Sequence, residues 1–114
     1  MDKQQKRELA KAYTQAKTIG AIYCIRNTQN GKVLLSSTTE LHGTKNRFNF
    51  TNTMKDCFHM KLRGDWKVMG NEVFVLEILE ELEMKSEQTL QEFKADLKVL
   101  MEMWEEKFDA AMLY

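Results

Sequence analysis

Apolar positions follow the periods of strands and of helices along this chain. The clearest strand pattern is a pair of short apolar runs. Residues 21–26 and 32–36 are rich in branched apolar side chains, and a polar stretch ending in Asn30-Gly31 separates them. Asn-Gly readily adopts the positive φ that a type I′ turn needs at both central positions. The pattern therefore predicts an antiparallel β-hairpin over residues 20–37.

Helices are predicted on both sides of this hairpin. Apolar residues at helical spacing predict one over residues 2–17 and another over residues 58–69, and a further helix is expected over residues 44–54, with Phe48 as its most apolar residue. Gly70 follows the segment 58–69 directly and is a good residue for ending a helix.

The C-terminal part of the chain combines a strand with a long helix. Residues 72–80 form an almost continuous branched apolar run, which predicts a strand buried on both faces and central in its sheet. A loop over residues 81–86 follows, and Ser86 is the expected N-cap of a helix that runs to about residue 111. The apolar stripe of this helix consists of Leu90, Phe93, Leu97, Leu100, Met101, Trp104 and Phe108.

These elements predict an α+β fold with a three-stranded, mainly antiparallel sheet flanked by helices. The chain has 114 residues, a length that suits one domain with a modest core. We expect that domain over residues 18–114, with residues 1–17 as a helical extension.

Charge divides the chain into two halves, although the 17 basic residues equal the 17 acidic ones. Residues 1–67 contain 13 Lys and Arg against 5 acids, whereas residues 68–114 contain 4 against 12. The basic half could contact DNA, with Arg26, Lys32, Lys45 and Arg47 as candidate residues. Equally, the acidic C-terminal helix could pack near the basic half.

Two cysteines, Cys24 and Cys57, are too few for a disulfide framework or a cysteine-based zinc site. We expect reduced thiols in a cytoplasmic protein. The N-terminus does not have the pattern of a signal peptide, and no apolar run approaches the length that spans a membrane.

The hairpin resembles the opening of the GIY-YIG nuclease family. Residues 21–23, Ala-Ile-Tyr, stand where the family has Gly-Ile-Tyr, and residues 34–36, Leu-Leu-Ser, stand where it has Tyr-Ile-Gly. Residues 70–82 resemble the turn into the family's third strand, and Trp66 and Trp104 lie in segments similar to helices of short bacterial members. The resemblance is collinear over residues 18–108, and it implies a GIY-YIG nuclease-like fold.

The resemblance also implies site residues. Tyr23 would act as the general base, and Arg47 would stabilise the charge of the scissile phosphate. Lys45 competes with Arg47 for that role, because the segment before it is longer than is usual in the family. A family glutamate would hold Mg or Mn.

Several family residues are replaced here. Leu34 replaces the second motif tyrosine, and Ser36 replaces the glycine. Met101 stands at the glutamate position, so Glu102 or Glu77 would have to bind the metal.

Three hypotheses follow. The first is a degenerate member of the family, a weakly active or non-catalytic module that binds DNA. The second is an active endonuclease that depends on Mg or Mn and has a rearranged site. The third is a protein-interaction module without a nucleic-acid role, in which the final helix forms a homodimer or docks a partner.

Overall fold

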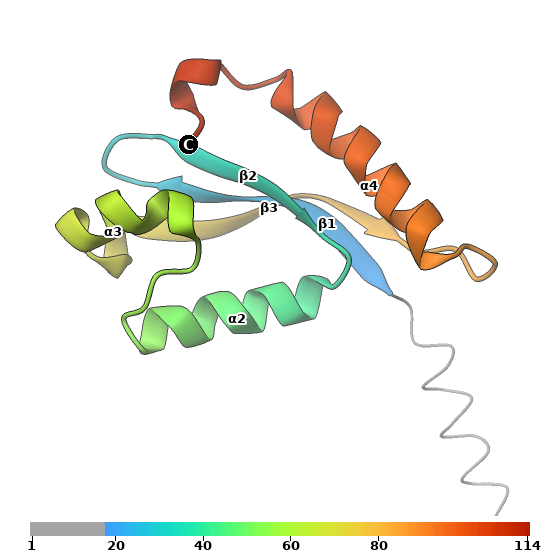
Figure 1. Ribbon diagram of the computed structural model, residues 1–114, viewed down its shortest axis with the longest axis horizontal. Coiled ribbons are helices and arrows are strands. Elements are labelled where there is room, and N and C mark those ends of the chain that lie inside the picture. The colour runs from blue at the N-terminus through green and yellow to red at the C-terminus, as the bar shows by residue number, and fades with distance from the viewer. Residues whose placement is uncertain (1–17) are drawn as a thin grey trace, which may run out of the picture.

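The computed structural model describes residues 18–114, which form an α+β domain around an open three-stranded sheet (Figure 1). The strands are β1 (Ile19–Asn27), β2 (Val33–Thr38) and β3 (Phe74–Glu83). The helices are α2 (Leu41–Thr53), α3 (Arg63–Met69) and α4 (Leu90–Glu105), joined by short 3₁₀ turns at residues 60–62, 71–73 and 110–112. The predicted fold class is confirmed, whereas the helix predicted over residues 2–17 lies outside the described residues.

The central strand is β1, which pairs in antiparallel fashion with β2 on one side and β3 on the other. The prediction that the strand after Gly70 is central was therefore wrong. Residues 20–25 of β1 are all buried, whereas most of β3 is only half-buried because no strand among the described residues covers its second edge. An apolar run does not distinguish a central strand from an edge strand, because the order of strands depends on pairing between distant segments.

The hairpin connection is longer than the predicted two-residue type I′ turn. Only Gly31 has a positive φ, at 77°, while Asn30 does not. The loop closes instead between Asn27 and Lys32, whose backbone N–H and C=O are 2.8 Å apart, and Gly31 N–H donates to Asn27 O. The Asn27 side chain, fully buried, accepts from the N–H of Gln29 at 2.9 Å and so directs the turn.

The helix boundaries differ from the predicted ones for local reasons. Helix α2 begins at Leu41, three residues early, and helix α3 begins only at Arg63 because His59 caps a 3₁₀ turn before it. Helix α4 has Thr89 rather than Ser86 as its N-cap, in a capping box with Glu92, and ends at Glu105. Strand β3 extends through Glu83, into the predicted loop.

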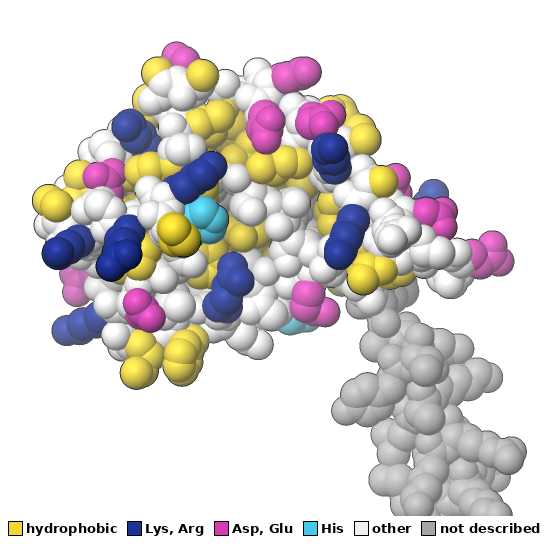
Figure 2. All heavy atoms as spheres, in the orientation of Figure 1, with side chains coloured by type: hydrophobic (Ala, Val, Ile, Leu, Met, Phe, Trp, Pro, Cys, Tyr) yellow, Lys and Arg dark blue, Asp and Glu magenta, His cyan; other side chains and the backbone are white. Residues whose placement is uncertain are grey.

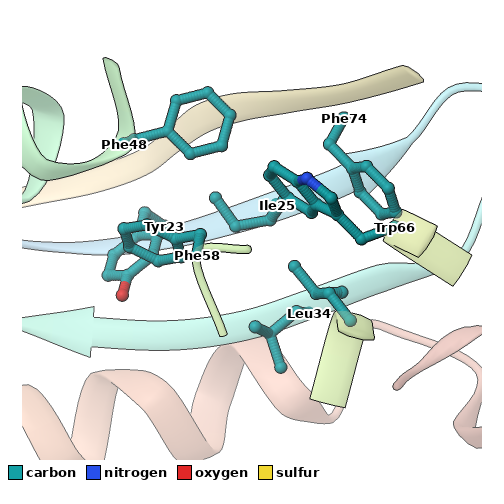
Figure 3. Packing of buried hydrophobic residues seen from close by; sticks show 8 residues of the cluster. Tyr23, Ile25, Leu34, Phe48, Phe58, Trp66 and Phe74 are labelled. Atoms are coloured by element: carbon teal, nitrogen blue, oxygen red, sulfur yellow. The ribbon is translucent and has the colours of Figure 1, made fainter. Parts of the chain in front are cut away.

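Each face of the sheet has its own apolar core. Helices α2 and α3 cover one face, and α4 covers the other (Figure 1). The core under α2 and α3 is largely aromatic (Figure 3), and its buried members are Tyr23, Ile25, Leu34, Phe48, Phe58, Leu62, Trp66 and Phe74. The core under α4 is built from Ile22, Cys24, Val33, Leu35, Phe93 and Leu97.

No helix among residues 18–114 combines the length and the apolar character that crossing a bilayer requires.

Candidate functional site

Tyr23 lies in β1 on the sheet face that α2 and α3 cover, and its side chain is 4% exposed. Its ring and the Phe58 ring form an edge-to-face pair with a centroid distance of 6.4 Å (Figure 3). Leu34, at the second tyrosine position of the motif, is buried in the same core. Tyr23 and Leu34, which the sequence resemblance matched to motif tyrosines, therefore both contribute to apolar packing.

Arg47 lies on the exposed side of α2, and its guanidinium carbon is 4.3 Å from the centre of the Phe58 ring. This is a cation–π geometry. Tyr23 and Arg47 thus both contact Phe58, so the structure brings these two predicted residues to one side of the sheet. Lys45, the alternative to Arg47, lines a groove between α2 and β3.

Glu77 and Arg26 lie on the opposite face of the sheet. Glu77 pairs across the strands with Cys24, whose side chain belongs to the core under α4, and directly paired residues share a face. The Arg26 side chain forms an ion pair with Glu77, with an Nε–Oε1 distance of 2.7 Å. Both groups are therefore already engaged with each other.

Glu102 is exposed on α4, while its neighbour Met101 packs against the core beneath that helix. The sheet thus separates Tyr23 and Arg47 from Glu77 and Glu102. The four predicted residues do not meet in one cleft. Within residues 18–114, no three His, Cys, Asp or Glu side chains are grouped so that they could hold a metal ion.

Cys24 follows Tyr23 in β1, and the pKa of its thiol is strongly shifted. Burial raises the pKa of its thiol from 9.0 to about 11, and the Glu77 carboxylate acts in the same direction while Arg26 opposes it. A thiol in this environment stays protonated at neutral pH and is a poor nucleophile.

Lys32 lies in the exposed loop of the hairpin, with its ammonium 5.8 Å from the ring centre of Tyr114. That ring is fixed by its hydroxyl, which donates to Asp65 at 2.7 Å and accepts from Asn27 at 2.9 Å. Lys32 therefore lies at the hairpin end of the molecule, beside α3.

Basic side chains are concentrated in α2, α3 and the segment between them. Residues 41–69 carry six Lys and Arg against two acids, Asp56 and Asp65. Figure 2 shows dark-blue side chains over the α3 end of the molecule. Sequence reasoning selected only two of the six. The others are Lys55, Lys61, Arg63 and Lys67, and the spacing of Arg63 and Lys67 on one predicted helix face was the available signal.

Comparison with protein-family models, with curated proteins and with solved structures finds no match to this chain.

Proposed function

We propose that this chain is a non-catalytic DNA-binding module with a degenerate GIY-YIG nuclease-like fold. The observation that carries the proposal is the basic character of the α2–α3 face, meaning the surface formed by residues 41–69. Six basic residues against two acids give this segment a clear positive charge, and Lys and Arg supply most phosphate contacts in DNA-binding proteins.

The arrangement of the motif residues supports a binding role over a catalytic one. Tyr23 is packed in the core, and the carboxylate of Glu77 is paired with Arg26 on the far face of the sheet. A metal-dependent hydrolase needs its base, arginine and metal ligand around one phosphate. DNA contacts on the α2–α3 face need none of that convergence. Lys45 and Arg47 would contribute on α2, and Lys32 would extend the surface at the hairpin loop.

The resemblance to the family is part of this proposal, and the order of the elements supports it. A hairpin, two helices, a strand and a final helix containing Trp104 follow one another in the order that the resemblance requires. A cytoplasmic location is also part of the proposal, since Cys24 and Cys57 are both free thiols.

The test is plasmid DNA incubated with the protein and Mg²⁺ or Mn²⁺, followed for both retention and integrity. We expect retention at low salt, loss of retention as salt rises, and intact supercoiled plasmid throughout. The double variant Lys45→Gln/Arg47→Gln should weaken binding. A control with the same loss of charge, Lys94→Gln/Lys98→Gln on α4, should bind like the unaltered chain.

Metal-dependent nicking that Tyr23→Phe abolishes would overturn the proposal in favour of an active endonuclease using Mg²⁺ or Mn²⁺. The absence of any retention at low salt would overturn it as well.

A protein-interaction role is the second candidate, and one observation favours it. Val99 and Met103, one turn apart on α4, are 56% and 54% exposed. This role predicts a homodimer through α4 in sedimentation analysis, which Val99→Glu should convert to a monomer.

A further inference from the structure

A cavity of about 440 Å³ opens between α3 and the segment that follows the C-terminal end of α2. Three cationic side chains line it, from three different places in the chain. Lys55 follows α2, Arg63 begins α3, and Lys67 lies one turn further along α3. None of the sequence motifs pointed to this cavity.

The charges around the cavity do not cancel. Among residues 18–114, Asp56 is the one acid that lines it, and its Oδ1 already accepts a hydrogen bond from the Cys57 N–H at 2.8 Å. Lys55, Arg63 and Lys67 form no ion pair or hydrogen bond through their side chains with any residue of the range 18–114. The lining therefore carries a net charge of about +2, which matches a phosphate dianion.

Lys55, which lines the cavity, also has an unusual backbone conformation. Lys55 has φ of 56°, a left-handed conformation that glycine normally occupies at the end of a helix. The turn is completed by Lys55 N–H donating to Asn52 O and Asp56 N–H donating to Thr51 O. A lysine in this conformation costs about 1–2 kcal/mol relative to glycine, and such strain concentrates at functional sites.

Trp66 is the most buried residue of the cavity lining, at 6% exposed. Its ring stacks on Phe74 at 4.5 Å, and its buried indole N–H has no hydrogen-bond acceptor within the described range. The Nε1 atom is closed off from solvent, so Trp66 forms part of the cavity wall, and its indole signal can report a bound ligand without donating to it.

We infer that this cavity binds a phosphate group, held by Lys55, Arg63 and Lys67 beside Trp66. The inference goes beyond the DNA-binding proposal, because it depends only on the lining of the cavity. The phosphate could belong to a small phosphate ester or to a polynucleotide backbone. The shared chemistry is a tetrahedral oxyanion recognised by charge-assisted hydrogen bonds.

The two tryptophans of the chain provide the measurement. Trp66 lies at the cavity, whereas Trp104 lies on α4 on the other side of the sheet, where its Nε1 donates to Glu80 at 2.8 Å. In a ¹⁵N-labelled sample, inorganic phosphate is added while NaCl keeps the ionic strength constant. We expect the indole signal of Trp66 to shift to saturation, with a Kd on the order of millimolar, and the Trp104 signal to stay in place.

The variant Arg63→Gln/Lys67→Gln should weaken this binding at least about tenfold, a loss of about 1.4 kcal/mol. Lys94→Gln/Lys98→Gln is the matched control, because both pairs are exposed and one turn apart on a helix. An unchanged Trp104 signal shows that each variant is folded. Equal shifts of both indoles, no saturation, or full phosphate affinity in Arg63→Gln/Lys67→Gln would overturn the inference.

Titration with a short DNA duplex in place of inorganic phosphate shows which kind of molecule supplies the phosphate group. If the duplex shifts Trp66 as phosphate does, and Arg63→Gln/Lys67→Gln prevents the shift, the site binds backbone phosphate. If phosphate saturates the cavity and the duplex leaves Trp66 unchanged, the site binds a small phosphate ester. Both outcomes support the cavity as a phosphate site, and the second leaves DNA binding to be judged on Lys45 and Arg47.

Discussion

At the scale of single residues, the two faces of the hairpin differ in what their side chains do. Tyr23 and Leu34 lie on the same face of the sheet, and both are buried in the aromatic core. Leucine has no group that could exchange a proton, so Leu34 contributes packing only. On the other face, Cys24 is buried as a protonated thiol beside the ion pair of Arg26 and Glu77.

The raised pKa of Cys24 predicts how stability depends on pH. The folded state holds the thiol proton more tightly than the unfolded chain does, since its pKa is about 11 rather than 9.0. This contribution is complete below pH 9.0 and is lost as the pH rises towards about 11, by about 2–3 kcal/mol. Urea unfolding of the unaltered chain should show this loss.

Tyr114 contributes in the same direction, because burial and its hydrogen bond to Asp65 raise the pKa of its hydroxyl. The Cys24 contribution is therefore obtained by comparing the pH dependence of the free energy of unfolding between the unaltered chain and Cys24→Ala. Cys57→Ser should keep the full pH dependence. Parallel curves for the unaltered chain and Cys24→Ala would contradict the prediction.

At the scale of elements, the packing of α4 depends on a close approach to β1 and on an irregularity in β3. A β-bulge shifts the register between Ile22 and Tyr23, so Ile22 pairs with Glu80 while Tyr23 pairs with Ile78. The extra residue changes which side chains of β3 face α4. Glu80 then accepts a hydrogen bond from the indole of Trp104 at 2.8 Å, which ties α4 to the edge strand.

Substitutions at two glycines should change the free energy of unfolding in opposite directions. A Cβ on Gly20 would lie 2.6 Å from Thr38 O and 2.8 Å from Phe93 Cζ, so Gly20→Ala should lower the free energy of unfolding by about 1–3 kcal/mol. Gly64 lies within α3 with nothing within 4 Å of its Cβ position. Gly64→Ala should therefore raise stability by up to about 1 kcal/mol.

Urea denaturation of the two glycine variants measures both changes on the same protein. Equal effects of Gly20→Ala and Gly64→Ala would contradict the packing described for α4 on β1.

Each described strand and α-helix could be predicted from the sequence, because burial leaves apolar runs or apolar stripes in the residues themselves. The boundaries depended on weaker local signals. Thr89 and Glu92 form a capping box that can be recognised in the sequence, so the prediction of Ser86 as the N-cap of α4 was wrong. The order of strands and the bulge could not be read, because both depend on contacts between residues more than 40 positions apart.

At the scale of the whole molecule, the sheet decides which residues can act together. It separates Tyr23 and Arg47 from Glu77 and Glu102, although the sequence suggested them as one set. Alternation along a strand indicates that neighbouring residues face opposite ways, but not which helix covers each face. The same division places α2 and α3, whose segment is basic, on one side of the sheet and the acidic helix α4 on the other (Figure 1).

The central claim is that DNA binds the α2–α3 face, and amide chemical shifts of the labelled chain titrated with a short duplex test it most directly. We expect shifts concentrated in residues 41–69 that diminish as salt increases, with the amides of α4 unaffected. Shifts centred on α4, or no shifts at low salt, would contradict the claim.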